Sequence, residues 1–126
     1  EEEYGAAVVA DELNDVWWDP IDLDHPFTSM ARRTLSSPLM LAAQRRVEHI
    51  AGMVRRHDID GVINPCHWGC RQGTGTRGLI QKGLQEHGVP VLNLEVDCVD
   101  ERNFSEGQLR TRLEAFVEMI DNRRSA

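Results

Sequence analysis

The sequence predicts an α/β domain, a parallel sheet with helices on both faces. Short apolar runs rich in Val, at residues 6–10, 61–64 and 89–94, are typical of buried strands. Amphipathic segments follow them at 38–57, 77–87 and 105–120. Alternation of strand and helix is the pattern of parallel sheets with helical crossovers, so we expect a sheet of the Rossmann-like or flavodoxin-like kind.

The first predicted strand, 6–10, ends at Asp11-Glu12. We expect an irregular stretch from there through Phe27, because Asp19-Pro20 and His25-Pro26 break regular structure. At least one of Trp17 and Trp18, which are adjacent, should pack outside this stretch. Ser37-Pro38 then predicts a helix start that runs to about His57. Its apolar face comprises Leu39, Ala43, Val47, Ile50 and Val54, and Arg45, Arg46, Glu48, Arg55 and Arg56 fall mainly on the other side.

The second half of the chain repeats the predicted alternation of strand and helix. After the strand at 61–64 we expect a loop over 65–76 and a helix from about Arg77, with Gly88 as its C-cap. The third strand, 89–94, precedes a helix that begins at Ser105, where Gln108 completes a capping-box pattern. The predicted apolar faces of the two helices are Leu79, Ile80 and Leu84, then Leu109, Leu113, Phe116, Val117 and Ile120.

Two features indicate a fragment. Three strands are few for such a sheet, where five or six are usual. The chain opens with Glu1-Glu2-Glu3-Tyr4-Gly5, which is typical of the end of a helix before a strand. We therefore expect residues 1–126 to be a C-terminal α/β domain that lacks its first strand–helix unit and belongs to a longer chain.

Composition narrows the function classes. The length of 126 residues suits one domain, and a formal charge of -7 argues against nucleic acid as the main partner. No apolar run approaches the roughly 20 residues of a membrane-spanning helix. Three cysteines, an odd and clustered set, indicate a reducing compartment and a possible metal rather than a disulfide framework. We expect a cytoplasmic location.

Ligands of open parallel sheets bind beyond the carboxyl ends of the strands, which here are Asp11-Glu12, the 65–76 loop and residues 95–103. The middle loop carries Cys66 and Cys70, and a thiol near a helix N-terminus should be a good thiolate donor for iron–sulfur clusters or zinc. The pair is separated by three residues, so zinc would need His67 or Cys98 as well. The alternative is that the two thiols are small buried hydrophobes, and we expect Cys98 to be structural.

A second motif, Gly73-x-Gly75-x-x-Gly78, matches a dinucleotide-binding pattern followed by the acidic pair Glu95 and Asp97. Its context is poor, because eight residues separate the glycines from the preceding predicted strand. The simpler explanation is that the glycines allow close approach and start a helix. His25, His49, His57, Arg102, Arg110 and Arg112 are interpreted as solvated surface residues.

The 66–75 loop also carries a family resemblance. Asp60-Gly61-Val62-Ile63 followed by His67-Trp68-Gly69-Cys70-Arg71 resembles the third domain of the 2-hydroxyacyl-CoA dehydratase subunits, a superfamily that includes benzoyl-CoA reductase subunits. The likeness continues through Gly88-Val89-Pro90-Val91-Leu92, Asp97 and the 102–108 segment, and it ends in Thr111-Arg112-Leu113-Glu114-Ala115-Phe116. Val8-Val9-Ala10-Asp11-Glu12-Leu13 is similar to the family's second strand of that domain, so essentially the whole chain is covered.

The resemblance implies a 4Fe–4S cluster and an obligate partner. Members are heterodimers whose homologous subunits each hold a cluster through one Cys from each of three segments, and Cys70 matches the third ligand. The other two ligands lie in earlier domains. Cys66 departs from the pattern and would be a group beside the cluster or a substitute ligand. Gly69, Arg71 and Gln72 would tune the Cys70 sulfur through hydrogen bonds, and His67 and Trp68 would shape or shield the pocket.

The resemblance also implies a reaction. An ATP-hydrolysing activator reduces the cluster, which passes one electron to the thioester of an acyl-CoA, and the ketyl radical expels the 2-hydroxyl to give an enoyl-CoA. One-electron chemistry suits this substrate because its β-hydrogen is barely acidic. Alternatives are a benzoyl-CoA reductase-like or double-cubane-cluster ATP-dependent reductase subunit. Two alternatives belong to other functional classes: a non-catalytic partner domain, and a zinc- or nucleotide-binding α/β module. The sequence does not identify the acyl group of the substrate.

Overall fold

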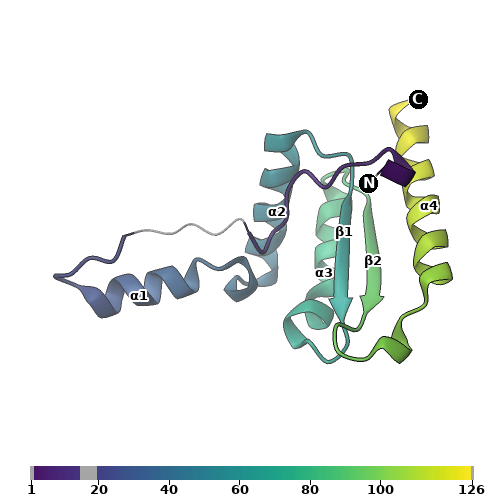
Figure 1. Cartoon of the computed structure of the whole chain (residues 1–126). Helices are drawn as coiled ribbons and strands as arrows, with labels where there is room; N and C mark the ends of the chain where they lie inside the picture. Colours follow the sequence, from purple (N-terminus) through teal and green to yellow (C-terminus); the bar gives the residue numbers. More distant parts are fainter. Residues whose placement is uncertain (1, 15–19, 126) are drawn as a thin grey trace.

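The computed structural model describes residues 2–14 and 20–125 (Figure 1). Its helices are α1 (Pro26–Leu35), α2 (Ala43–His57), α3 (Arg71–Glu86) and α4 (Glu106–Arg124), and its strands are β1 (Val62–His67) and β2 (Val91–Val96). Short 3-10 turns, η1 (Glu2–Tyr4), η2 (Pro38–Met40) and η3 (Glu101–Asn103), complete the set. From α2 onward, helices and strands alternate as the hydrophobic pattern predicts.

The two strands pair in parallel. Their register runs from Val62 opposite Val91 to His67 opposite Val96, and α3 is the crossover that joins them. Helices α2 and α3 lie on one side of the sheet and α4 lies on the other (Figure 1). The α/β class with a parallel sheet and helices on both faces is therefore confirmed.

The main hydrophobic core lies where α2 and α3 meet the sheet. Its buried members come from α2, α3 and the segment just before β2, and they are Val47, Ile50, Ala51, Ile80, Leu84 and Val89. Ile80 and Leu84 are almost fully buried, as the periodicity predicts, whereas Leu79 is 61% exposed and belongs to the outer face of α3. Because adjacent helical positions point about 100° apart, Ile80 and Leu79 cannot share one face.

Helix α4 covers the opposite side of the sheet, close to the start of β1. A Cβ on Gly61 would lie 2.7 Å from Ile120 Cδ1 and 2.8 Å from Phe116 Cζ, so the two side chains can pack this closely on the strand because residue 61 is glycine. Phe116 is buried, while the rest of the predicted face of α4 is half-buried. The Arg112 and Arg123 guanidinium groups donate to the main-chain oxygens of Asn93 and Gly88 at 2.5 and 2.9 Å.

Polar groups cross the interior between the strands and α3. Asn64 donates its side-chain amide to Asn93 Oδ1 at 2.9 Å, and Asn93 donates to Gln81 Oε1 at 2.8 Å. Buried amides are tolerated only when they are hydrogen-bonded, and a register slip of one residue would break this chain of bonds. The three side chains therefore favour the observed alignment of β1, β2 and α3.

The N-terminal region departs from the sequence prediction. Residues 6–10 are extended but form no strand, and Val8 and Val9 are 72% and 59% exposed. An apolar run becomes a strand only when a neighbouring strand pairs with it, and propensity alone does not supply one. The stretch predicted to be irregular through Phe27 ends in α1, because Pro26 occupies the first turn of a helix, where its missing N–H costs nothing. The expectation for Trp17 and Trp18 lies outside the described residues.

Several boundaries also differ. Ser37-Pro38 starts η2 rather than the long helix, which begins at Ala43. Strand β1 continues through Pro65 and Cys66 to His67, and α3 begins at Arg71, so the predicted 65–76 loop shrinks to the turn at residues 68–70. Ser105 is the N-cap of α4 but makes no side-chain capping bond. Proline fits β1 because it lies on a strand with a free edge among the described residues.

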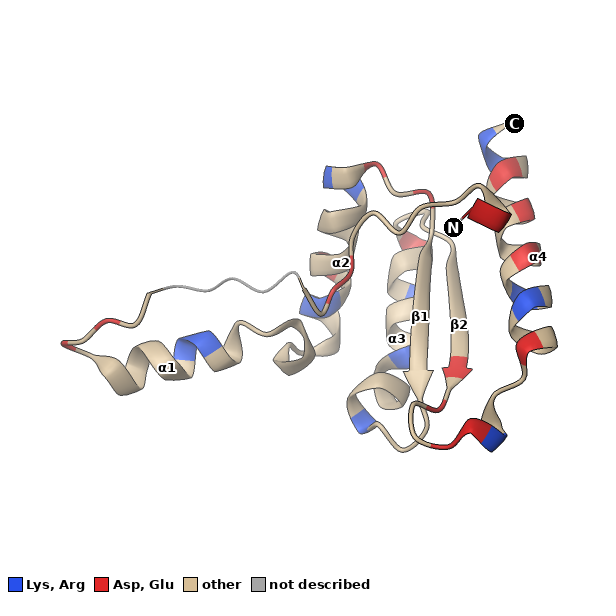
Figure 2. Cartoon of the chain, in the orientation of Figure 1, with Lys and Arg blue, Asp and Glu red and all other residues tan. Residues whose placement is uncertain are grey.

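Charge is distributed around the sheet rather than on it. Strand β1 carries no Lys, Arg, Asp or Glu, and β2 carries only Glu95, near its carboxyl end (Figure 2). The loop after β2 and the outer surface of α4 hold clusters of both signs (Figure 2). Within the described ranges, every helix is too short or too polar to cross a membrane.

Candidate functional site at the carboxyl end of the sheet

The turn between β1 and α3 forms the centre of the candidate site. The main-chain N–H of Trp68 donates to Val96 O at 2.9 Å, which carries the strand pairing one residue past His67. Gly69 then adopts a left-handed conformation with φ +74°, which a side chain would strain, and the Cys70 N–H donates back to His67 O at 3.1 Å. This tight turn places Cys70 directly beyond the carboxyl end of β1.

Cys70 is the N-cap of α3. Its sulfur accepts a hydrogen bond from the Gly73 N–H at 3.4 Å, and its carbonyl accepts from Thr74 N and Thr74 Oγ1 at 2.9 and 2.7 Å. The residue is half-buried, so the thiol is held by the helix and still reached from outside. A backbone N–H on the sulfur is a contact by which proteins tune metal-bound thiolates.

The other two thiols have different surroundings. Cys66 is 1% exposed and packs inside the sheet, where its Sγ lies 3.6 Å from Asn64 O. Burial raises the pKa of the Cys66 thiol, which opposes metal binding as a thiolate. This burial favours, for Cys66, the alternative of a small buried hydrophobe. Cys98 is exposed on the loop after β2, so it does not pack in the core formed by the described residues.

The loop after β2 is organised around Asp97. Its carboxylate accepts hydrogen bonds from Val99 N at 2.9 Å, Asp100 N at 3.2 Å and Asn103 Nδ2 at 2.8 Å. The Asn103 side chain and then these backbone N–H groups hold the pKa of Asp97 below its ordinary value. Asp100 forms a separate pair with Arg102, with contacts of 2.6 to 3.1 Å, and this pair lowers the pKa of the Asp100 carboxyl.

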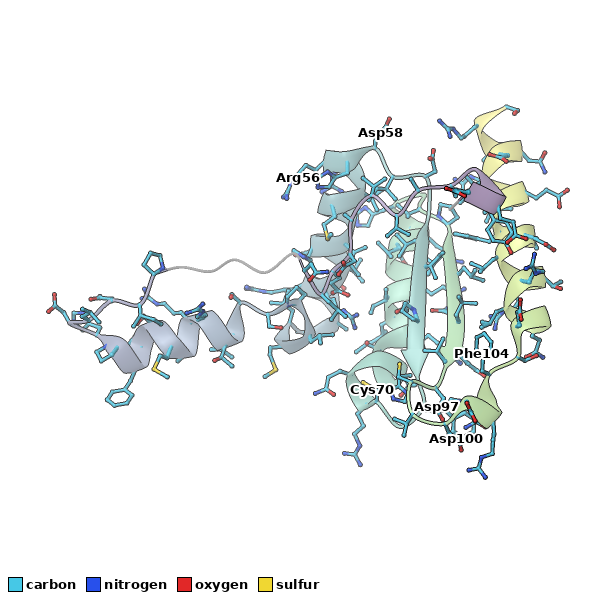
Figure 3. All side chains as sticks on the ribbon, viewed as in Figure 1. Arg56, Asp58, Cys70, Asp97, Asp100 and Phe104 are labelled. Carbon is cyan, nitrogen blue, oxygen red and sulfur yellow. The ribbon has the colours of Figure 1, made fainter. Side chains whose placement is uncertain are left out.

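Side chains also connect the two loops. His67 Nδ1 lies 4.0 Å from Asp97 Oδ1, and that nitrogen is buried with no hydrogen-bond partner among the described residues. Nearby, Arg77 of α3 pairs with Glu95 of β2 at 2.9 Å. Figure 3 shows Cys70, Asp97, Asp100 and Phe104 gathered at this end of the molecule. The anchoring by Asp97 and Asn103 was missed from sequence, although an Asp at the start of a short polar loop is a turn signal.

The remaining predicted site residues lie on the outside of the turn. Trp68 is 67% exposed, and Arg71 and Gln72 are exposed on the first turn of α3. Val99 and Phe104, on the neighbouring loop, are 87% and 63% exposed. Large apolar side chains are thus exposed both on the Cys70 turn and on the loop after β2.

The structure contradicts the dinucleotide interpretation. All three glycines of the motif lie within α3, and β1 runs almost to the start of that helix. Phosphate-binding glycines belong to the turn before a helix, where they expose N–H groups, and here that turn holds Trp68, Gly69 and Cys70 instead. The acidic partners are engaged, Glu95 by Arg77 and Asp97 by its own loop.

Asp11-Glu12 does not join the site as a free ligand. Glu12 forms a two-bond pair with Arg46, at 2.6 Å for each contact, and Arg46 also donates to Thr76 Oγ1 at 3.3 Å. Arg46 is only 7% exposed, so its predicted place on the polar face of α2 is wrong. The Glu12 carboxylate is used to join the N-terminal segment to α2 and α3.

Within residues 2–14 and 20–125, no three His, Cys, Asp or Glu side chains are arranged around a common metal position. The closed zinc set that would need Cys66, Cys70 and His67 or Cys98 is not brought together, since Cys66 is in the core and Cys98 is at the surface. Of the three thiols, Cys70 is the one that is half-buried and accepts a backbone N–H on its sulfur, a set of features compatible with a thiolate ligand. Two shallow hollows, of about 310 and 290 Å³, lie at the opposite end of the sheet around Gly88 and Arg123.

The sequence profile of the family described as 2-hydroxyglutaryl-CoA dehydratase, D-component, matches residues 1–120. A benzoyl-CoA reductase subunit of Thauera aromatica is 28% identical over 82 residues, which are 64% of this chain and 19% of that protein. The alpha subunit of lactoyl-CoA dehydratase from Anaerotignum propionicum is 26% identical over 102 residues, 78% of this chain and 24% of that protein.

A third relative, the alpha subunit of (R)-2-hydroxyglutaryl-CoA dehydratase from Acidaminococcus fermentans, is 26% identical over 86 residues, 68% of this chain and 18% of that protein. The chain thus spans less than a quarter of the length of each of these relatives. Because the family profile covers almost all of the sequence, the chain belongs to the 2-hydroxyglutaryl-CoA dehydratase D-component family.

Proposed function

We propose that this chain is the C-terminal domain of an iron–sulfur subunit of a 2-hydroxyacyl-CoA dehydratase. The reaction would remove water from a 2-hydroxyacyl-CoA and yield an enoyl-CoA. Support comes from the family match and from two relatives named as lactoyl-CoA and 2-hydroxyglutaryl-CoA dehydratase subunits. The small share of each relative that is covered fits a domain of a longer subunit.

The environment of Cys70 carries the proposal. Of the three thiols, one is buried in the core and one is on an exposed loop, and only Cys70 lies half-buried at a helix N-terminus with an N–H on its sulfur. That site is at the carboxyl end of a parallel sheet, where α/β folds bind their ligands. We assign Cys70 as one ligand of a 4Fe–4S cluster whose other protein ligands come from other parts of the longer subunit.

The neighbours of Cys70 have separable roles in this proposal. Gly69 permits the left-handed turn, and Gly73 donates to the sulfur. Arg71 and Gln72 stand on the exposed first turn of α3, where they can donate hydrogen bonds to an anionic group beyond it. His67 and Trp68 border the turn on the strand side and would limit the access of water. When bound, the cluster would supply the single electron that activates the thioester of the substrate.

Partners are part of the same proposal. Large apolar side chains are exposed at Trp68 on the Cys70 turn and at Val99 and Phe104 on the loop after β2, and a partner subunit would cover such surface. All three relatives are named as subunits. We propose a heterodimer with a homologous subunit, reduced by an ATP-dependent activator protein. A cytoplasmic location would keep the thiols reduced.

A second candidate is a reductase, which includes the benzoyl-CoA reductase-like and double-cubane-cluster types. It is favoured by the 28% identity to a benzoyl-CoA reductase subunit, similar to the identity to the two dehydratases. The complete complex, supplied with activator, ATP and reductant, distinguishes the two. A dehydratase forms enoyl-CoA from 2-hydroxyacyl-CoA without net consumption of reductant, whereas a reductase consumes electrons in proportion to product.

Cys70→Ala in the full-length subunit tests the proposal, and Cys66→Ala is its matched control. Prepared without oxygen, the unchanged protein should be brown and contain about four iron atoms per cluster. Cys70→Ala should lose most of the iron and at least about 90% of the activity, because a 4Fe–4S cluster that loses a thiolate is no longer held. Cys66→Ala should keep both, because the Cys66 thiol is used only in packing.

Iron content and absorption spectrum are the measurements. Full retention of the cluster in Cys70→Ala, or equal loss in both variants, would reject Cys70 as the ligand. A colourless full-length protein with about one zinc per chain would favour a zinc module instead, and a colourless metal-free protein would favour a non-catalytic partner.

A further inference from the structure

Asp97 is more constrained than a loop carboxylate usually is. Its side chain is 11% exposed although it follows the end of a strand, and its two oxygens accept three hydrogen bonds from Val99, Asp100 and Asn103. All three donors belong to its own loop. The orientation of the Asp97 carboxylate is therefore set by hydrogen bonds within its own loop and does not depend on a hydrogen bond from β1.

His67 presents an unsatisfied nitrogen to this carboxylate. Its Nδ1 is buried and has no hydrogen-bond partner in the described part of the chain, and Asp97 Oδ1 lies 4.0 Å away. Buried polar atoms normally have a partner, and a carboxylate is the strongest acceptor for an imidazole N–H. The ring is still 35% exposed, so the part of it away from Nδ1 reaches the surface of the site.

A backbone hydrogen bond also connects His67 to the turn that carries Cys70. Its carbonyl accepts from the Cys70 N–H at 3.1 Å, and the intervening Trp68 N–H donates to Val96 O, one residue before Asp97. A movement of His67 therefore moves the turn that carries the sulfur. The close approach of the His67 and Asp97 side chains and the backbone hydrogen bond thus link the carboxyl ends of β1 and β2 at adjacent positions.

We infer that Asp97 is a positioning residue that holds His67, and through it the Cys70 turn, in the geometry needed by the bound cluster. The inference rests on the proposed function. A carboxylate behind an imidazole is the arrangement that orients histidines at many metal centres, where it leaves the second ring nitrogen for the metal group or its ligands. Here Asp97 is the carboxylate, and His67 is the last residue of β1, directly before the turn that ends at Cys70.

The neighbouring Asp100 supplies a matched control. It lies on the same loop and carries the same charge, but its carboxylate is paired with Arg102. Asp97→Asn keeps the size of the side chain and one acceptor for the loop N–H groups, so the loop can remain folded. Asp100→Asn removes an equal charge three residues away without touching His67.

The experiment compares Asp97→Asn, His67→Gln, the double variant and Asp100→Asn in the full-length subunit with its partner, loaded anaerobically with iron and sulfide. One measurement is the rate at which the chelator bathophenanthroline removes iron, and the other is the electron paramagnetic resonance spectrum of the dithionite-reduced cluster. We expect about tenfold faster iron loss and an altered spectrum in Asp97→Asn and in His67→Gln. The double variant should lose iron no faster than the worse single one, because the two residues act as a unit.

Asp100→Asn should behave as the unchanged protein in both measurements. A wild-type rate and spectrum in Asp97→Asn would overturn the inference, as would equal effects of Asp97→Asn and Asp100→Asn, or effects of Asp97→Asn and His67→Gln that multiply in the double variant. A loss of thermal stability in Asp97→Asn with an unchanged spectrum would show a purely structural role and overturn it as well. The proposed function fails separately, through retention of iron in Cys70→Ala.

Discussion

At the residue scale, the surroundings of single charged side chains differ most from expectation. Arg46 follows Arg45 in a helix that otherwise has a clear polar face, yet it is 7% exposed and forms two contacts of 2.6 Å with Glu12. The side chains of this pair are 9% and 16% exposed, so water screens the charges poorly. The pair therefore joins residues 34 positions apart through a nearly buried contact.

Glu12→Gln should lower the free energy of unfolding by about 3 kcal/mol, because it leaves the buried Arg46 guanidinium without its counter-charge. Glu95→Gln is the matched control: it breaks the Arg77–Glu95 pair at 2.9 Å, whose side chains are 41% and 60% exposed, and should cost less than about 1 kcal/mol. Urea denaturation of the purified chain measures both. Similar losses in the two variants would contradict the importance of the Glu12–Arg46 pair.

At the scale of elements, the close contact between α2 and α3 depends on glycine at position 83, which has no side chain. A Cβ on Gly83 would lie 2.7 and 2.8 Å from the two methyl carbons of Val47, closer than real atoms approach. Val47 is 3% exposed and sits in the core with Ile80 and Leu84, so it has little room to move. The glycines of α3 are therefore not equivalent, and the sequence motif that groups three others of them does not include this one.

Gly83→Ala should lower the free energy of unfolding by about 1 kcal/mol, since overpacking at Val47 outweighs the gain in helix propensity. Gly78→Ala, in the same helix, meets nothing within 4 Å and should raise it by up to about 1 kcal/mol. The midpoint of chemical denaturation distinguishes the two. A stabilising effect of both substitutions would show that the helices separate more easily than the packing indicates.

At the scale of the whole molecule, the surface loops hold their carboxylates in the charged form. The pKa values of Asp11, Asp22, Asp97 and Asp100 are all lowered from 3.8. The largest causes are the Asn14 side chain for Asp11, the Asp24 N–H for Asp22, the Asn103 side chain for Asp97 and the Arg102 side chain for Asp100. All four act in turns or loops, so they affect the connections more than the core.

The sign of the pH dependence follows from these lowered pKa values. Near pH 4 the unfolded chain binds more protons than the folded one, so the stabilisation is complete above about pH 4 and is lost as pH falls through the lower folded-state pKa values. We expect the urea midpoint to drop as the pH falls below about 4. The double variant Asp97→Asn with Asp100→Asn should show a smaller drop. A midpoint that rises on acidification would contradict the prediction.

Much of the fold could be predicted because local patterns and tertiary packing agree. The spacing of Val47, Ile50 and Val54 marks the side of α2 that packs on the core, and the helix ends at His57, as predicted, with Asp58 in a left-handed conformation. The prediction of a strand at residues 6–10 is wrong because a high Val content shows only that a segment suits a strand. Pairing is decided by another strand, and among the described residues only β1 and β2 pair.

The candidate site could be predicted only in part. Cys70 and its neighbours lie at the strand end where the alternation of elements puts them, and the Gly73 contact follows from the N-cap position. The different surroundings of Cys66 and Cys70 could not be predicted, because the sequence pattern assigns both residues to one loop, whereas Pro65 and Cys66 continue β1. In a strand, Cys66 points inward by alternation with His67.

Periodicity and short motifs, which are properties of neighbouring residues, were enough to predict the α/β class, the order of α2 through α4, the family and the importance of the 66–71 segment. The long-range contacts could be found only in the folded chain: Cys66 lies in the core, Glu12 pairs with Arg46, and Asp97 lies beside His67 at the ends of two neighbouring strands. Each of these depends on which residues far apart in the chain meet, and that is fixed by the parallel register of β1 and β2 and by the packing of the helices on them.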